Sequence, residues 1–299
     1  MALRAGQLAA TAIREATSGE IVSVYRSAIN LLLDSGRLIA LLIPRGPIHP
    51  WAFDGVWWSE NIRKGMPVGI SDGILSIDRF ELRIDSIPIV DLALRRKCRF
   101  VADEPRRRLG EIVSVFEPEN IFNPVISNCL EQYRSTGNIA FVASALGVGS
   151  GLTPSGDDIL VGVLAALDLT SEKNHGNLND LSERSPNGSV SSDRWRTKSP
   201  ASRLRKNLVS ALPASLGNHT TMLSAQMLEA AISGHYPEPL VTLCDVLVDS
   251  FDEANLIRAA NAIERLGHES GRALLSGFVM GLETVEKFRG LYNPHIYKH

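Results

Sequence analysis

The sequence has few cysteines, and it has no excess of charge of either sign. Its three cysteines, Cys98, Cys129 and Cys244, form no C-x-x-C pair, which argues against zinc or dithiol chemistry and fits a reducing compartment. With 31 Lys and Arg against 33 Asp and Glu, the chain lacks the overall field that attracts nucleic acid or an anionic membrane. We therefore expect no membrane partner, and a nucleic-acid partner would need a local basic patch.

Long apolar runs are also missing. No stretch approaches the roughly 20 apolar residues of a transmembrane helix, and Arg14 with polar neighbours interrupts the N-terminal apolar run before it reaches the length of a signal-peptide core. Hydrophobic residues nevertheless make up 44% of the 299 residues, so the chain can bury a sizeable core. These features predict a cytoplasmic protein, and the length favours two domains.

The apolar pattern changes along the chain. After a short amphipathic helix at residues 3–16, short β-rich runs separated by Gly, Pro, Asp and Ser predict a small β-sandwich or barrel. From about residue 104 the spacing becomes helical, and strands followed by helices without alternation indicate an α+β protein. We expect a β-rich domain at residues 1–103 and a helical domain at residues 104–299. Examples of the β-rich runs are residues 21–25, 28–33, 38–43 and 80–84, and the long helical patterns are residues 122–136, 159–169, 221–233, 239–251, 253–266 and 272–288.

Two polar stretches interrupt this pattern. Residues 171–202 are rich in Ser, Asn, Arg, Lys and Asp, which predicts a flexible excursion. Residues 95–108 carry a run of arginines that could touch RNA or a protein partner. No aromatic residues are interleaved with them, so a solvated surface is the simpler interpretation.

The most informative segment reads GVGSGLTPSGDD at residues 147–158 and leads directly into an apolar helix. Glycines permit left-handed backbone angles and let main-chain N–H groups approach a ligand, and a helix start adds free donors and partial positive charge. Such places bind anions well. Neither nucleotide template fits, because Leu152 stands where a dinucleotide fingerprint needs glycine, and Asp157 replaces the lysine of a Walker motif.

The paired carboxylates of Asp157 and Asp158 need a separate explanation. Two adjacent negative charges repel an anion unless a cation lies between them or one of them points elsewhere, and Mg²⁺ bound by both is one remedy. The alternative is purely structural. Ser155 and Asp158 have the spacing of a capping box, and acidic residues in a first helical turn favour the helix dipole whatever the function.

A second copy of this helix start occurs later. Residues 155–162, SGDDILVG, are echoed by residues 270–277, SGRALLSG, with Ser, Gly, Leu and Gly in register. The echo predicts two helices that pack against each other through their second glycines, and chance similarity is the alternative. If the two starts converge, one site would hold the carboxylates of Asp157 and Asp158 and the cation of Arg272.

Other candidate residues lie beside predicted helix starts. Thr220 and Thr221 could cap a helix or hold a carboxylate or phosphoryl oxygen. His219 and His268 could act as acids or bases near neutral pH. No H-x-x-x-H spacing and no supported nucleophile elbow occurs, so the pattern does not indicate a zinc site or a serine hydrolase.

Three of these motifs together resemble a known family. They are residues 149–158, the helix start that continues with Leu223 and Ser224, and GHESG at residues 267–271. Their order and the β-then-α layout resemble the bacterial family, long catalogued as of unknown function, that contains the oxamate carbamoyltransferase accessory subunit of allantoin degradation. The resemblance extends from about residue 20 to about residue 285.

The resemblance implies a carbamoyltransferase-like subunit that binds a small anionic carboxylate or carbamoyl (phosphate) ligand. In that system oxalurate and phosphate are exchanged for oxamate and carbamoyl phosphate by a complex of several subunits. The alternative is a non-catalytic metabolite-binding or assembly subunit. The expected partners are a small anionic metabolite and either other subunits of such a complex or further copies of the chain.

The candidate site follows from the motifs and the resemblance. Asp157, Asp158 and His219 are the candidate catalytic residues, and Asp157 and Asp158 are the candidate ligands if Mg²⁺ is required. Arg272 would pair with a carboxylate. The remaining candidate ligand-binding residues are Gly149, Ser150, Gly151, Thr153, Ser155, Gly156, Thr220, Thr221, Ser270 and Gly271.

Overall fold

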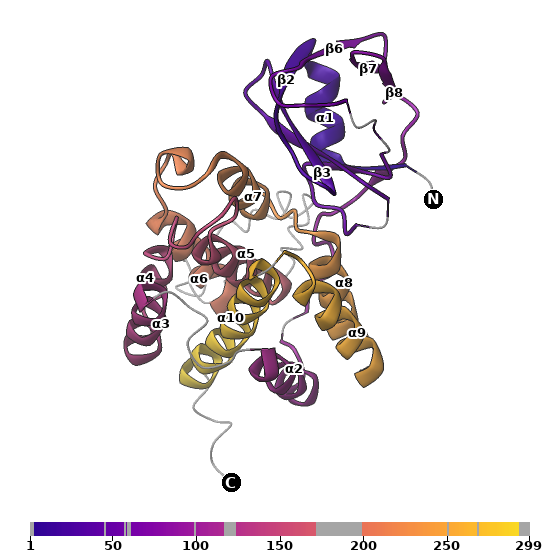
Figure 1. Ribbon diagram of the computed structural model, residues 1–299. Helices are drawn as coiled ribbons and strands as arrows, with labels where there is room; N and C mark the ends of the chain where they lie inside the picture. The colour runs from indigo at the N-terminus through magenta and orange to yellow at the C-terminus, as the bar shows by residue number, and fades with distance from the viewer. Residues whose placement is uncertain are drawn as a thin grey trace, which may run out of the picture.

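A computed structural model shows a curled β-sheet joined to a mainly helical body (Figure 1). The structure describes residues 3–44, 46–56, 58, 61–98, 100–116, 124–171, 199–249, 251–267 and 269–292. The expected α+β class is therefore confirmed, with the sheet as a half-barrel at the N-terminal side. Within these residues no helix has the length and apolarity needed to span a lipid bilayer.

The sheet has nine described strands in the order β8-β7-β6-β2-β3-β4-β5-β1-β9, and most neighbours are antiparallel. Alternating apolar residues of β2, β3 and β7 point to one face, where Ala9, Ala12 and Ile13 of α1 (Gln7–Glu15) complete a hydrophobic core. Figure 1 shows α1 lying along the curled sheet. The strands are β1 (Arg4–Gly6), β2 (Ser18–Val24), β3 (Ala28–Leu33), β4 (Leu38–Leu42), β5 (Ala52–Asp54), β6 (Pro67–Ser71), β7 (Ile74–Ile77), β8 (Phe80–Arg83) and β9 (Ile89–Val90).

One boundary of the N-terminal prediction was wrong. Residues 4–6 were expected in a helix, but they form β1, which pairs with β5 and β9. A local apolar pattern cannot reveal this strand, because the strand exists only through hydrogen bonds to partners some 50 to 85 residues away in the chain.

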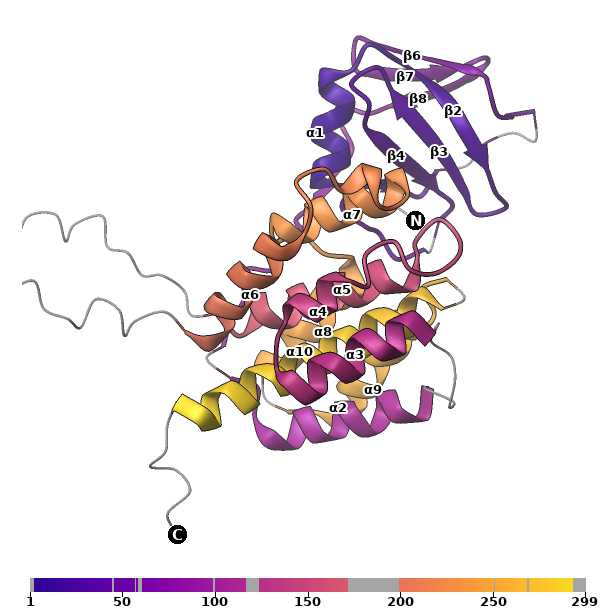
Figure 2. The same cartoon turned by 90° about the vertical axis from the view of Figure 1, so that its left-hand side faces the viewer.

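The helical body is built around α5 (Ser155–Leu169), of whose 15 residues all but Asp158 are buried. A helix that is apolar all round must lie at the centre of its domain, and Figure 2 shows it surrounded by other helices. Those helices are α2 (Asp103–Phe116), α3 (Pro124–Thr136), α4 (Ala140–Ala143), α6 (Pro200–Ala211), α7 (Met222–Ile232), α8 (Glu238–Val248), α9 (Glu253–Glu264) and α10 (Ser270–Tyr292), with a short 3-10 turn at Leu216–Asn218.

The predicted pairing of the two glycine-bearing helices is confirmed. A Cβ atom on Gly162 of α5 would lie 2.1 Å from the carbonyl oxygen of Leu274, and one on Gly277 of α10 would lie 2.2 Å from that of Ile159. The two helices therefore touch backbone to backbone. Because successive contacts advance along both helices together, they run in the same direction and their starts meet at the same end.

The sheet and the helical body meet at α7 (Figure 2). The side chain of Gln226, which is 4% exposed, accepts a hydrogen bond from the Leu38 N–H at 2.7 Å and donates to the Leu38 carbonyl at 2.8 Å. Trp51 donates its indole N–H to the Gln226 carbonyl at 3.0 Å. Through the side chain of Gln226, α7 thus bonds to both main-chain polar groups of Leu38 in β4. The domain boundary at residues 103 and 104 stays a prediction.

The expected excursion at residues 171–202 falls largely on residues 172–198, outside the described part of the chain. Its two ends are ordered: Ser171 is buried, and the hydroxyl of Ser199 caps α6 by accepting from the Ser202 N–H.

Candidate functional site

Three helix starts converge on the glycine-rich loop. Thr153 of the loop bonds to Ser270 at the start of α10, with 2.8 Å between the hydroxyl oxygens. Thr221, the N-cap of α7, donates to the Leu152 carbonyl. The loop itself leads into α5. The structure therefore brings together residues 147–158, 220–224 and 269–271, which the sequence analysis had selected separately.

Asp157 holds this arrangement together. Its carboxylate is 1% exposed and accepts hydrogen bonds from the Gly147 N–H at 2.7 Å, from the Ser224 hydroxyl at 2.6 Å and from the Thr220 hydroxyl. Both oxygens are thus occupied, as a buried carboxylate requires. The geometry gives Asp157 a positioning role, and its assignment as a catalytic or metal-binding residue stays a prediction.

Asp158 has a different environment. The residue is partly buried, but its Oδ2 atom is shielded from solvent and has no hydrogen-bond partner among the described residues. Burial raises the pKa of this carboxyl well above its usual 3.8, and the neighbouring charge of Asp157 adds to the rise, while the hydroxyls of Ser270 and Thr153 oppose it. The rise shifts this carboxyl toward its neutral form, in which it repels an anion less.

The capping box predicted from Ser155 and Asp158 does not form. Pro154 is the N-cap of α5, and Ser155, already inside the helix, directs its hydroxyl to Glu269 at 3.4 Å. Pro154 has no side-chain donor or acceptor, which leaves the helix start without a side-chain cap.

The glycines of the loop fall into two groups. Gly147 and Gly156 serve internal contacts, since the N–H of Gly147 bonds to Asp157 and that of Gly156 bonds to the Val148 carbonyl at 2.9 Å. Gly149 and Gly151 are exposed, with φ angles of +129° and +88° that favour glycine. Over residues 149–151 no N–H group has a hydrogen-bond partner in the described structure. Free donors thus remain in the exposed part of the loop.

A cleft of about 740 Å³ borders the loop at Leu152 and Thr221. Residues of the N-terminal part of the chain also line it, among them Tyr25, the buried Asn30, Arg63 and Lys64. Sequence reasoning missed these sheet residues, because no motif surrounds them and only the contact between sheet and α7 brings them near the loop.

Several predicted ligand-binding residues have partners within the chain. The N–H of Gly271 bonds to the Leu266 carbonyl at 2.8 Å, and Arg272 forms an ion pair with Glu264 at 2.9 Å. The side chain of His219 is exposed beside the loop. His268 lies outside the described residues. The described residues contain no group of three or more His, Cys, Asp or Glu that could hold a metal ion.

The arginine-rich stretch is neutralised by acidic neighbours. Arg96 pairs with Asp249 at 2.5 Å, Arg106 with Asp103 at 2.8 Å, Arg107 with Glu104 at 2.8 Å and Arg108 with Glu111 at 2.7 Å. Such a surface offers little net positive charge to a nucleic acid.

Comparison with known proteins yields two family matches. Residues 145–282 match the model described as oxamate carbamoyltransferase subunit AllH, and residues 2–89 match the AllH family N-terminal domain. No curated protein and no solved structure matches the chain. The first match contains the loop and all three converging helix starts, and the second contains most of the sheet. The chain therefore belongs to the AllH family of oxamate carbamoyltransferase subunits.

Proposed function

We propose that this chain is a carbamoyltransferase-like subunit that binds a small anionic carboxylate or carbamoyl (phosphate) ligand at residues 149–151. The observation that carries the proposal is the unbonded, exposed N–H groups of these residues, which lie in the loop that leads into α5 and that bonds to the starts of α7 and α10 through Leu152 and Thr153. Helix N-termini present partial positive charge and free donors, and both favour a bound anion.

The surroundings of the loop support an anion. Arg63 and Lys64 line the adjoining cleft and attract negative charge, while burial raises the pKa of Asp158 and shifts its carboxyl toward the neutral form. Thr220 and Thr221 already donate within the chain, so they serve mainly to fix the loop. Fixed main-chain donors would stabilise charge that develops on a transferred carbamoyl or phosphoryl oxygen.

The reaction implied by the family moves a carbamoyl group between the nitrogen of oxamate and an oxygen of phosphate. Both ligands are small anions, and each needs its charge balanced while the group passes between them. The loop would hold one anionic end, and the cleft leaves room for the second ligand. Asp158 and His219 are the candidates for handling the proton on the nitrogen.

The direct test compares two glycine substitutions. Gly151→Ala and Gly36→Ala both place a methyl group at a positive φ, with nothing within 4 Å in either case. Each should cost on the order of 1 kcal/mol of stability, but only Gly151→Ala should reduce the affinity for carbamoyl phosphate, phosphate or oxamate, by about tenfold or more. Calorimetric titration of the purified chain measures both. Equal affinity in the two variants would remove the loop from the proposed site.

The alternative of a non-catalytic or assembly subunit also has a structural observation in its favour. Tyr25, Leu152 and Met222 leave 46%, 46% and 49% of their surface exposed around the same cleft. Apolar side chains gathered at one place suit contact with another protein. Turnover by the purified chain alone would support the enzyme, and binding with turnover only after partner subunits are added would support the subunit role.

A further inference from the structure

A polar pair in the sheet lines the cleft beside the glycine-rich loop. Ser23 of β2 and Asn30 of β3 are cross-strand neighbours, and the Nδ2 of Asn30 donates to the Ser23 hydroxyl at 2.9 Å. Both residues line the cleft of about 740 Å³, as do Leu152 and Thr221. The pair belongs to none of the motifs selected from the sequence, so it is a part of the candidate site that those motifs do not explain.

A β-bulge turns Ser23 toward the cleft. Ile21 pairs with Leu31, whereas Ser23 pairs with Asn30, so Val22 is an extra residue in β2. Ile21 and Leu31 are buried in the core of the sheet. Because residues two apart on a regular strand share a face, Ser23 would otherwise lie on the core face with Ile21. The extra residue places Ser23 on the face of Asn30 instead, and bulges often re-aim side chains beside binding sites in this way.

The hydrogen bond between the two side chains leaves one polar group free on each. The Oδ1 of Asn30 accepts no hydrogen bond from the described residues, and the hydroxyl hydrogen of Ser23 has no acceptor among them. Asn30 is only 6% exposed, and a polar side chain buried to this extent normally has all its groups bonded. The pair thus offers one acceptor and one donor, side by side, at the cleft.

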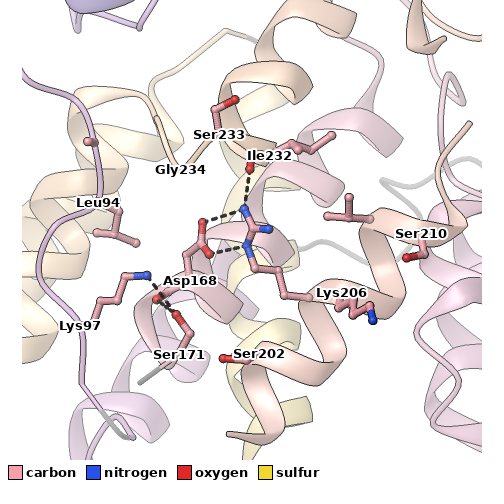
Figure 3. Close-up of a pocket in the computed structure, with 13 residues that line it drawn as sticks. Leu94, Lys97, Asp168, Ser171, Ser202, Lys206, Ser210, Ile232, Ser233 and Gly234 are labelled. Carbon is pink, nitrogen blue, oxygen red and sulfur yellow. Dashed lines mark hydrogen bonds and ion pairs between the residues drawn. The ribbon is translucent and has the colours of Figure 1, made fainter. Parts of the chain in front are cut away.

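A buried polar side chain at another cavity shows the difference. At the end of α5 that lies away from the loop, Asp168 is also 6% exposed, and it accepts from the Arg205 Nε at 2.5 Å (Figure 3). Its other oxygen accepts from the Tyr236 hydroxyl at 2.6 Å, and Arg205 donates onward to the Ile232 carbonyl at 2.6 Å. That network is complete within the chain, so the stability of the fold explains it. The pair at the cleft is incomplete in the same sense and needs another explanation.

A primary amide or ureido group complements the free groups of the pair. Its N–H can donate to the Oδ1 of Asn30 while its carbonyl oxygen accepts from the Ser23 hydroxyl, whereas a carboxylate has no hydrogen for the first bond. We propose that Ser23 and Asn30 recognise the amide end of the ligand and so select an amide over the corresponding carboxylate. This inference rests on the proposed function, because it places the amide-bearing ligand in the cleft that borders the anion-binding loop.

The experiment compares oxamate with oxalate, in which a carboxylate replaces the amide, by calorimetric titration of the full-length chain. The native chain should bind oxamate more tightly, because oxalate brings a negative charge and no donor to the Oδ1 of Asn30. Asn30→Leu removes that acceptor and should lower the ratio of oxamate affinity to oxalate affinity by about tenfold.

A matched pair of serine variants supplies a second test that leaves Asn30 in place. Ser23→Ala removes the donor to the amide carbonyl and should weaken oxamate binding by about tenfold. Ser76→Ala also removes a hydrogen-bonded hydroxyl from a strand, but Ser76 is not among the residues that line the cleft, so oxamate binding should not change. Thermal unfolding shows whether each variant is folded.

The amide inference is overturned if the native chain does not prefer oxamate, if folded Asn30→Leu keeps the native ratio, or if Ser23→Ala binds oxamate as Ser76→Ala does. Phosphate, which has no amide, separates this inference from the proposed function. Gly151→Ala should weaken phosphate binding and Asn30→Leu should not. A loss in Gly151→Ala together with an unchanged ratio in Asn30→Leu would retain the loop as the anion site and remove only the amide recognition.

Discussion

At the scale of single residues, the two neighbouring aspartates separate into different tasks. Asp157 is fully bonded and fixes the loop to the start of α7, whereas Asp158 has an unpaired, shielded oxygen and a raised pKa. Their adjacency in sequence suggested that both carboxylates bind one metal ion or that both repel the same anion. In the structure the two side chains have different surroundings, because consecutive residues of a helix point about 100° apart.

Asp158 should give the protein a recognisable pH dependence. Its folded-state pKa lies above the 3.8 of an unperturbed Asp, so the folded chain holds this proton more tightly than the unfolded chain. The contribution of Asp158 to stability is therefore greatest at low pH, and it falls as the pH rises from about 4 through the raised pKa.

Asp158→Asn removes this titration and keeps the shape of the side chain. The stability of the variant relative to the native chain should increase as the pH rises, as measured by urea unfolding at several pH values from 4 to 8. A constant difference over that range would mean that the folded-state pKa of Asp158 is ordinary.

At the scale of elements, the contact between α5 and α10 is the main feature of the helical body. Glycine within a helix lowers the stability of that helix. Gly162 and Gly277 offset this cost because each allows the backbone of the other helix to approach closely. The sequence echo showed that two such helices exist. It is the mutual approach of their backbones that brings two helix starts to the site.

A pair of glycine substitutions tests this contact. In Gly277→Ala the new Cβ would lie 2.2 Å from the Ile159 carbonyl oxygen, so the helices must separate and the chain should lose about 2 kcal/mol or more of stability. In Gly110→Ala, within α2, the Cβ meets nothing within 4 Å, and stability should rise by about 0.5–1 kcal/mol. Chemical unfolding measures both changes. Similar effects in the two variants would show that the contact between the helices is loose.

At the scale of the whole molecule, the cleft exists because the sheet rests on α7. Gln226 and Trp51 bond the two parts directly, and Arg4 of β1 bridges Asp54 of β5 and Glu238 of α8 at 2.8 and 2.7 Å. These bonds fix the position of the N-terminal residues that line the cleft, among them Arg63 and Lys64, relative to the glycine-rich loop. The candidate site therefore needs both parts of the chain.

The exposed apolar side chains around the cleft lead to a prediction about assembly. If they contact another subunit or a second copy of the chain, Met222→Lys should weaken that association, because it places a charge in an apolar contact. Phe251→Lys is the matched control, since Phe251 is also exposed, at 41%, and is not among the residues that line the cleft. Light scattering with and without partner subunits measures the association. Equal association in both variants would locate the contact elsewhere.

The sequence by itself determined the broad organisation of this protein. Strand-like alternation followed by helical spacing is a local property, so it indicated the α+β class, and β3 was found at its predicted residues, 28–33. Local motifs also located the glycine-rich loop and its echo, and these carried the family resemblance. The shortest strands, β1, β5 and β9, were missed because two or three residues hold too little local pattern and depend on their partners.

Only the tertiary structure decided what the candidate residues do. The partners of Asp157 on α7 lie 63 and 67 residues further along the chain, and Gln226 finds Leu38 188 residues away. No local pattern encodes such distances. Whether a glycine N–H is free for an anion or already bonded, and whether an aspartate is charged, depends on which distant groups packing brings within about 3 Å.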